Sequence, residues 1–137
     1  MEYRISIGNQ GFDNLRQRKC FYIDKTYFIR EWWESKDKAT LIARPRRFGK
    51  TLNMSMLNCF FSNQYADRGD LFEGLSIWKN DDYRKIQGTY PVIFLSFADL
   101  KSCSFNEARN TIAAIINDAY KQYRFLLGSD IMSDSEK

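Results

Sequence analysis

The sequence predicts an α/β fold in which a parallel β-sheet is flanked by helices. Two short apolar runs, residues 39–43 and 90–97, have the length and composition of buried strands. Each run is followed by a helical pattern, and the order strand, loop, helix, strand, helix is typical of parallel sheets. Because such sheets normally have more strands and are covered on both faces, we expect the chain to be part of a larger domain.

The first regular element expected is a helix that begins after Asp24 and ends near Ser35. Residues 1–19 are mixed and polar and predict an irregular lead-in, and residues 20–23 fit a short extended piece. Asp24 is a suitable N-cap because its carboxylate can accept a hydrogen bond from the amides of the first turn. The apolar side of this helix carries Phe28, Ile29, Trp32 and Trp33, the two tryptophans being interpreted as core and interface residues.

A strand, a loop and a second helix are expected between residues 39 and 62. The run 39–43 is the strand, residues 44–50 are the loop, and the helix begins near Gly49 or Lys50 and ends near Ser62. A helix so apolar is covered on much of its surface, as one flanking a sheet would be. Its stripe consists of Leu52, Met56, Leu57, Cys59, Phe60 and Phe61.

The rest of the chain predicts a second strand and a long helix. The polar and aromatic stretch 63–89 contains a short helix around residues 70–75, and residues 90–97 form the strand, with proline tolerated near its start. Ser104 and Glu107 fit a capping box for a helix that ends near residues 127–128, whose apolar stripe is interpreted as packing. The expected domain spans residues 1–128, and the polar tail 129–137 is interpreted as the start of a linker.

Composition excludes several functional classes. The 137 residues are 44% hydrophobic and 28% charged, which is typical of one soluble globular domain. No run is long enough to span a membrane and no secretory signal is visible, so we expect a cytoplasmic protein without membrane contact. The chain has no histidine, which removes histidine-activated nucleophiles and the common zinc sites. Its three cysteines lie far apart and are interpreted as buried thiols.

The segment with the clearest chemistry is A-R-P-R-R-F-G-K-T, which begins at Ala43 and ends at Thr51. A Walker A loop reads G-x-x-x-x-G-K-[ST] between a strand and a helix. Gly49, Lys50 and Thr51 match its second half, whereas Arg44 replaces the first glycine and enters the loop extended because a proline follows it. The net charge is +4, and the basic residues gathered in this loop predict an anionic partner.

The expected chemistry is the binding of ATP phosphates and Mg²⁺. Amides in the first turn of a helix lack internal partners, and the helix dipole favours a negative charge there. Gly49 lets the backbone approach the phosphates, Lys50 reaches the β- and γ-phosphates as the catalytic cation, and the Thr51 hydroxyl ligates Mg²⁺. The predicted nucleotide-binding residues are Arg46, Arg47, Phe48, Gly49, Lys50, Thr51 and Leu52. Either Arg46 or Arg47 could instead face solvent or a partner.

Together these residues resemble the predicted AAA-ATPase-like family, whose members carry an R-P-R-R-F-G-K-T loop. The segment F-Y-I-D-K-T at 21–26 resembles the family's Y-x-D-K-T, and Y-P-V-I-F-L-S-F at 90–97 resembles its P-V-I-x-L-S-F. The resemblance implies an ATP-binding P-loop domain with arginine at position 44. It also implies a PD-(D/E)XK-type nuclease domain further along many of its chains, and therefore DNA as a partner of the longer protein.

The family's Walker B pair, an apolar strand that ends in adjacent carboxylates, has no counterpart that we can identify. Asp81 and Asp82 lie in a polar stretch, Asp99 follows the second predicted strand singly, and Asp130 and Asp134 lie in the tail. We therefore expect a partial P-loop fold truncated before the Walker B strand, which binds nucleotide with negligible hydrolysis. Asp99 is a weaker candidate for a polar neighbour of the nucleotide.

Two other functions stay open on the residues alone. The arginines of the loop could track a nucleic-acid backbone, or the loop could be a degenerate P-loop kept as a scaffold for a protein partner. Missing strands would leave apolar faces open, so self-association of the chain is also expected. Phe12 and Tyr22 could stack on adenine, although packing is the simpler interpretation of both.

Overall fold

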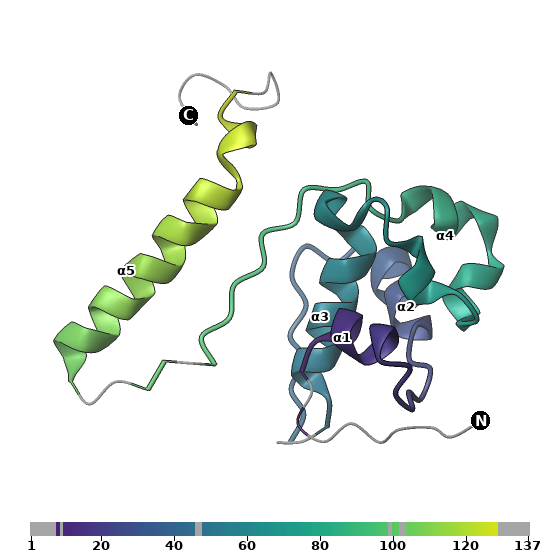
Figure 1. Ribbon diagram of the computed structural model, residues 1–137, viewed down its shortest axis with the longest axis horizontal. Helices are drawn as coiled ribbons and strands as arrows, with labels where there is room; N and C mark the ends of the chain where they lie inside the picture. Colours follow the sequence, from purple (N-terminus) through teal and green to yellow (C-terminus); the bar gives the residue numbers. More distant parts are fainter. Residues whose placement is uncertain (1–7, 9, 46–47, 99, 102–103, 129–137) are drawn as a thin grey trace. The chain divides into compact units, whose positions relative to one another are not determined.

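The computed structural model describes residues 8, 10–45, 48–98, 100–101 and 104–128. Arg46, Arg47, Asp99, Cys103 and the tail 129–137, to which the sequence assigned roles, lie outside the described residues. The chain divides into two compact units, Met1–Val92 and Ile93–Lys137, which are described separately below. Figure 1 shows the helices of each unit.

The first unit is built from four α-helices and three short 3₁₀ turns within its described part. Helix α1 packs on α3 and η2, while α2 and α4 pack on η3 (Figure 1). The elements are α1 Phe12–Gln17, α2 Tyr27–Ser35, α3 Lys50–Phe61, η1 Asn63–Tyr65, η2 Gly69–Phe72, η3 Ser76–Lys79 and α4 Asp81–Ile86.

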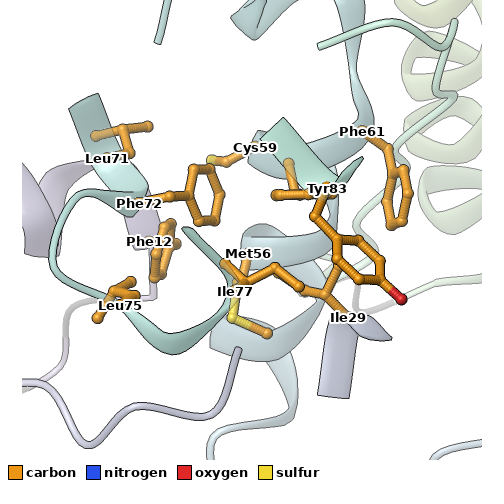
Figure 2. Close-up of a cluster of buried hydrophobic side chains, with 11 residues drawn as sticks. Phe12, Ile29, Met56, Cys59, Phe61, Leu71, Phe72, Leu75, Ile77 and Tyr83 are labelled. Atoms are coloured by element: carbon orange, nitrogen blue, oxygen red, sulfur yellow. The ribbon is translucent and has the colours of Figure 1, made fainter. Parts of the chain in front are cut away.

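An aromatic core joins these elements, as Figure 2 shows. The Phe72 ring lies 5.2 Å from that of Phe12 and meets the Phe60 ring edge to face at 5.1 Å. Trp33 stacks on Phe61 at 5.3 Å, which confirms its interpretation as a packing residue. The buried cluster comprises Phe12, Ile29, Met56, Cys59, Phe60, Phe61, Leu71, Phe72, Leu75, Ile77 and Tyr83.

The prediction of an α/β fold with a parallel sheet flanked by helices is wrong. The described residues are helical or irregular and contain no β-strand or sheet. Residues 39–43 and 91–97 lie in irregular chain, where Leu41 is 91% exposed and Ile93 is 62% exposed. An apolar run becomes a strand only when another strand pairs with it, and neither of these runs has such a neighbour in the described structure.

Backbone pairing joins residues 60–63 of the first unit to residues 88–90. Ser62 and Tyr90 form an isolated parallel bridge. The Tyr90 amide donates to the Phe61 carbonyl (2.9 Å), and the Asn63 amide donates to the Tyr90 carbonyl (2.7 Å). The Gly88 amide adds a bond to the Phe60 carbonyl (2.8 Å). These bonds tie the end of α3 to the chain that follows α4.

Several predicted helix boundaries agree with the structure. Helix α3 has the predicted bounds to within one residue, and α2 ends at Ser35 as expected but begins at Tyr27, later than predicted. Helices α1 and α4 lie in stretches for which the sequence predicted irregular chain. Both have only six residues, so each offers too few turns for an apolar period to be recognised.

The second unit contains the long helix α5, Phe105–Gln122, followed by the 3₁₀ turn η4, Arg124–Leu126. The Ser104 hydroxyl accepts a hydrogen bond from the Glu107 amide (3.3 Å), which confirms Ser104 as the predicted N-cap. Of the apolar stripe that the sequence predicted to pack, Tyr123 is buried, and Ala108, Ile115 and Ala119 are half-buried, whereas Phe105 is exposed. The helix also ends earlier than predicted.

Two further sequence predictions are tested by the fold. Cys20 and Cys59 are free and buried, as predicted, and burial raises the pKa of the Cys59 thiol to about 11. None of the helices in the described parts of the chain is both long and apolar enough to cross a membrane.

Candidate functional site

The start of helix α3 presents backbone amides that no side chain caps among the described residues. Gly49 is the N-cap and adopts the left-handed conformation (φ 74°, ψ 22°), which an L-residue with a side chain enters at a cost of about 1–2 kcal/mol. The first helical hydrogen bond runs from the Asn53 amide to the Gly49 carbonyl (2.9 Å). Among the described residues, the amides of Lys50, Thr51 and Leu52 have no acceptor within the helix and can donate to a ligand.

A cavity of about 400 Å³ lies beside this helix start. Three cations line it, together with an amide side chain and apolar groups, and no carboxylate is among its described lining residues. Such a wall favours an anionic ligand, because the cations would repel one another less once a negative charge lay between them. The described lining residues are Lys25, Phe28, Ile42, Arg44, Phe48, Lys50 and Asn53.

The ammonium of Lys50 is already engaged within the loop. Its Nζ donates a hydrogen bond to the Arg44 carbonyl at 2.5 Å, so the side chain bridges the two ends of the loop. Arg44 thus occupies the first glycine's position, its carbonyl accepts from Lys50, and the residue is part of the cavity wall. A phosphate oxygen that entered the cavity would compete with this carbonyl for the same ammonium.

The structure brings together only some of the predicted site residues. Lys50 and Phe48, which is 62% exposed, lie in the cavity wall. Gly49, Thr51 and Leu52 adjoin the cavity in sequence but are not part of its wall. Thr51 is exposed on the first turn of α3, whereas Leu52 is half-buried and packs against the core. Arg46 and Arg47, also predicted to bind nucleotide, lie outside the described residues.

Sequence reasoning missed four residues of the cavity wall, which are Lys25, Phe28, Ile42 and Asn53. Lys25 comes from the segment before α2, yet a methyl group at Gly49 would lie 3.8 Å from its Nζ. The only signal for it was the F-Y-I-D-K-T segment, which carries a lysine between two polar residues. The spacing along the chain cannot show that this lysine reaches the loop of residues 44–51.

Asp24 and Thr26 clamp the segment that contains Lys25 to η3. The Asp24 carboxylate accepts hydrogen bonds from the Thr26 amide (2.9 Å), the Thr26 hydroxyl (2.6 Å) and the Ser76 amide (2.7 Å). The Thr26 hydroxyl, which is fully buried, also accepts from the Ile77 amide (3.2 Å). Asp24 is therefore not the N-cap of α2, which is Thr26, but the centre of a tertiary contact.

The hydrogen bonds of this clamp lower the pKa of Asp24. Burial alone would raise the pKa of the carboxyl group, but the bonds from Thr26 and Ser76 stabilise the ionised form more strongly. The pKa of Asp24 therefore lies below its ordinary value. The clamp is thus strongest when Asp24 is ionised.

The two residues considered for stacking on adenine both pack into the protein. Phe12 has no exposed surface and belongs to the core, so its interpretation as a packing residue is confirmed. The Tyr22 hydroxyl contacts the Met56 sulfur at 3.2 Å, and the Tyr22 ring meets Phe12 edge to face at 5.4 Å. Burial raises the pKa of Tyr22 to about 12, so its hydroxyl stays protonated at neutral pH.

A loop that ends in glycine-lysine-threonine at a helix start, beside a cationic cavity, is typical of the class of P-loop ATPases. Comparison with known proteins identifies the family: the chain matches the description Predicted AAA-ATPase over residues 6–135 and belongs to the AAA-ATPase-like family. The resemblance seen in the sequence is thereby confirmed.

One curated relative is itself described only by its position in a genome. It is an uncharacterized protein in the vnfD 5′ region of Azotobacter chroococcum mcd 1, 32% identical to this chain over 95 residues. The aligned part covers 69% of this chain and 17% of that protein, so the chain spans a small part of its relative's length. No solved structure matches the chain significantly.

Proposed function

We propose that this chain is the nucleotide-binding module of an ATPase and that the phosphates of ATP bind in the cavity beside the start of α3. The observation that carries the proposal is the cavity wall, where Lys25, Arg44 and Lys50 converge without a described carboxylate. Membership of the AAA-ATPase-like family supports nucleotide as the source of the negative charge.

In this proposal the helix start and Lys50 hold the phosphates. The amides of Lys50, Thr51 and Leu52 donate to phosphate oxygens, and Lys50 exchanges the Arg44 carbonyl for a phosphate. Charge-assisted hydrogen bonds contribute about 1.5–3 kcal/mol each. Three or four such bonds can supply the roughly 8 kcal/mol of binding free energy that corresponds to micromolar affinity.

Magnesium and the remaining loop residues have supporting roles. The Thr51 hydroxyl is exposed on the first turn of α3, one residue after Lys50, and is a hard oxygen ligand of the kind Mg²⁺ accepts. When bound, the ion would neutralise part of the phosphate charge. Phe48 covers one side of the cavity, and Arg46 and Arg47 supply further positive charge to the loop.

The proposal for this chain is binding rather than turnover. Hydrolysis needs groups that position water and complete the magnesium site, and no described residue of the cavity wall is a carboxylate. We propose that ATP hydrolysis is a property of the longer protein.

The test is the affinity of a fluorescent ATP analogue, measured by titration with Mg²⁺ present. We expect Lys50→Ala to weaken binding about 10-fold or more, because at least one charge-assisted hydrogen bond is lost. Lys79→Ala is the matched control, since Lys79 is exposed and does not line the cavity. Equal affinity of the wild-type chain and Lys50→Ala would rule out the assigned site.

A further inference from the structure

We propose that Lys25 is a second phosphate-binding lysine, which reaches the cavity from the segment before α2. The proposal rests on the proposed function and extends it to a residue outside the loop of residues 44–51. Lys25 lines the cavity together with Lys50, and its Nζ would lie 3.8 Å from a methyl group at Gly49. Its ammonium is therefore next to the residue whose carbonyl begins α3.

The charge of Lys25 is available to a ligand. Within the described residues, Lys25 forms no ion pair. Asp24 is next to it in sequence, and both oxygens of its carboxylate accept hydrogen bonds from Thr26 and Ser76. An exposed lysine on a flexible stem loses much side-chain entropy when it binds a ligand. Its contribution to binding is larger when its backbone is already held, because no backbone entropy is then lost as well.

The backbone of Lys25 is held on both sides. Its amide donates to the Tyr22 hydroxyl (3.4 Å), and its carbonyl accepts from the Phe28 amide (3.0 Å). The clamp formed by Asp24 and Thr26 fixes the two flanking residues against η3. Anchoring of this kind lowers the entropy lost on binding, because only the side chain remains to be ordered.

Two lysines that approach from two elements favour a ligand with more than one phosphate. Lys50 belongs to the loop of residues 44–51, and Lys25 belongs to the segment that the clamp holds. Each can therefore bind a different phosphate of one polyphosphate ligand. A polyphosphate brings more negative charge and more oxygens to the two ammonium groups than a monophosphate does. The recognised chemistry is thus a polyphosphate, and we expect ATP and inorganic tripolyphosphate to bind more tightly than AMP.

The experiment uses the whole 137-residue chain and inorganic tripolyphosphate, which displaces the fluorescent ATP analogue. We expect Lys25→Ala to weaken tripolyphosphate binding about 10-fold or more, as for the loss of one charge-assisted hydrogen bond. Lys25→Arg should retain most of the affinity, and Lys79→Ala should retain all of it. Melting temperatures from circular dichroism establish that each variant is folded, and Lys25→Gln replaces Lys25→Ala if the latter melts early.

The outcomes separate the two proposals. If Lys25→Ala binds as the wild-type chain does while Lys50→Ala binds weakly, the role of Lys25 is rejected and the proposed function stands. If the wild-type chain binds neither the analogue nor tripolyphosphate, both are rejected. An equal loss in Lys25→Ala and Lys79→Ala would show a general effect of net charge and would also reject the Lys25 site.

Discussion

Gly88 occupies a position where both the backbone conformation and the space around it require glycine. Its φ is 69°, and a methyl group there would lie 2.4 Å from the Cα of Ala66. Its amide also donates to the Phe60 carbonyl, so the chain cannot move aside without breaking that bond. Gly74 has a similar φ of 79° but nothing within 4 Å of an added methyl group.

The two glycines give a matched pair of substitutions. We expect Gly74→Ala to cost about 1–2 kcal/mol, the strain of the left-handed conformation alone. Gly88→Ala should cost at least about 3 kcal/mol, because the backbone of Ala66 must also be displaced. Urea denaturation of both variants measures the difference. Equal losses of stability would mean that Gly88 and Ala66 are not in contact in solution.

Asp24 predicts a dependence of stability on pH. Because its folded pKa lies below its ordinary value of about 3.9, its ionised form stabilises the folded state. This contribution is complete above the unfolded pKa and is lost as the pH falls through the folded pKa. The stability difference between the wild-type chain and Asp24→Asn should therefore shrink between pH 5 and pH 2. Urea titrations across that range measure it, and a constant difference would contradict the role of the Asp24 carboxylate.

At the scale of single residues, the sequence could predict Lys50 but not Lys25. Lys50 stands inside a contiguous motif at a recognisable helix start, so local spacing is enough to select it. Lys25 joins the cavity only because Asp24 and Thr26 fasten its segment to η3, about 50 residues further along. Contacts of that separation leave no periodic trace in one sequence.

At the scale of elements, helices were predicted better than strands because a helix is a local structure. The pattern of α3 contains its own evidence, since its hydrogen bonds join residues four apart. A strand depends on a partner elsewhere in the chain. The run at residues 39–43 has the composition of a strand, yet it lies exposed without one in the described structure.

The N-cap of α5 can be tested by substitution. We expect Ser104→Ala to destabilise the helix by about 1 kcal/mol, because the Glu107 amide loses its acceptor. Ser104→Asp should preserve the cap. Amide hydrogen exchange in the first turn of α5 reports the change directly. Unchanged exchange in Ser104→Ala would show that the hydroxyl does not cap the helix in solution.

At the scale of the whole molecule, stability should reside in the aromatic core of the first unit. Phe72 has no exposed surface and lies against Phe12 and Phe60. We expect Phe72→Ala to cost about 3–5 kcal/mol. Phe105→Ala removes the same side chain where it is 81% exposed, so its cost should stay within about 0.5 kcal/mol. Thermal denaturation of the two variants compares them, and similar losses would contradict this core.

The meeting of residues 60–63 with residues 88–90 has a consequence for the order in which the first unit folds. Its backbone bonds close a loop of about 30 residues, which costs about 3 kcal/mol of chain entropy. That cost is recovered only after the aromatic side chains inside the loop have packed. We therefore expect closure late in folding, after the rate-limiting barrier, so that weakening it accelerates unfolding and leaves the refolding rate nearly unchanged.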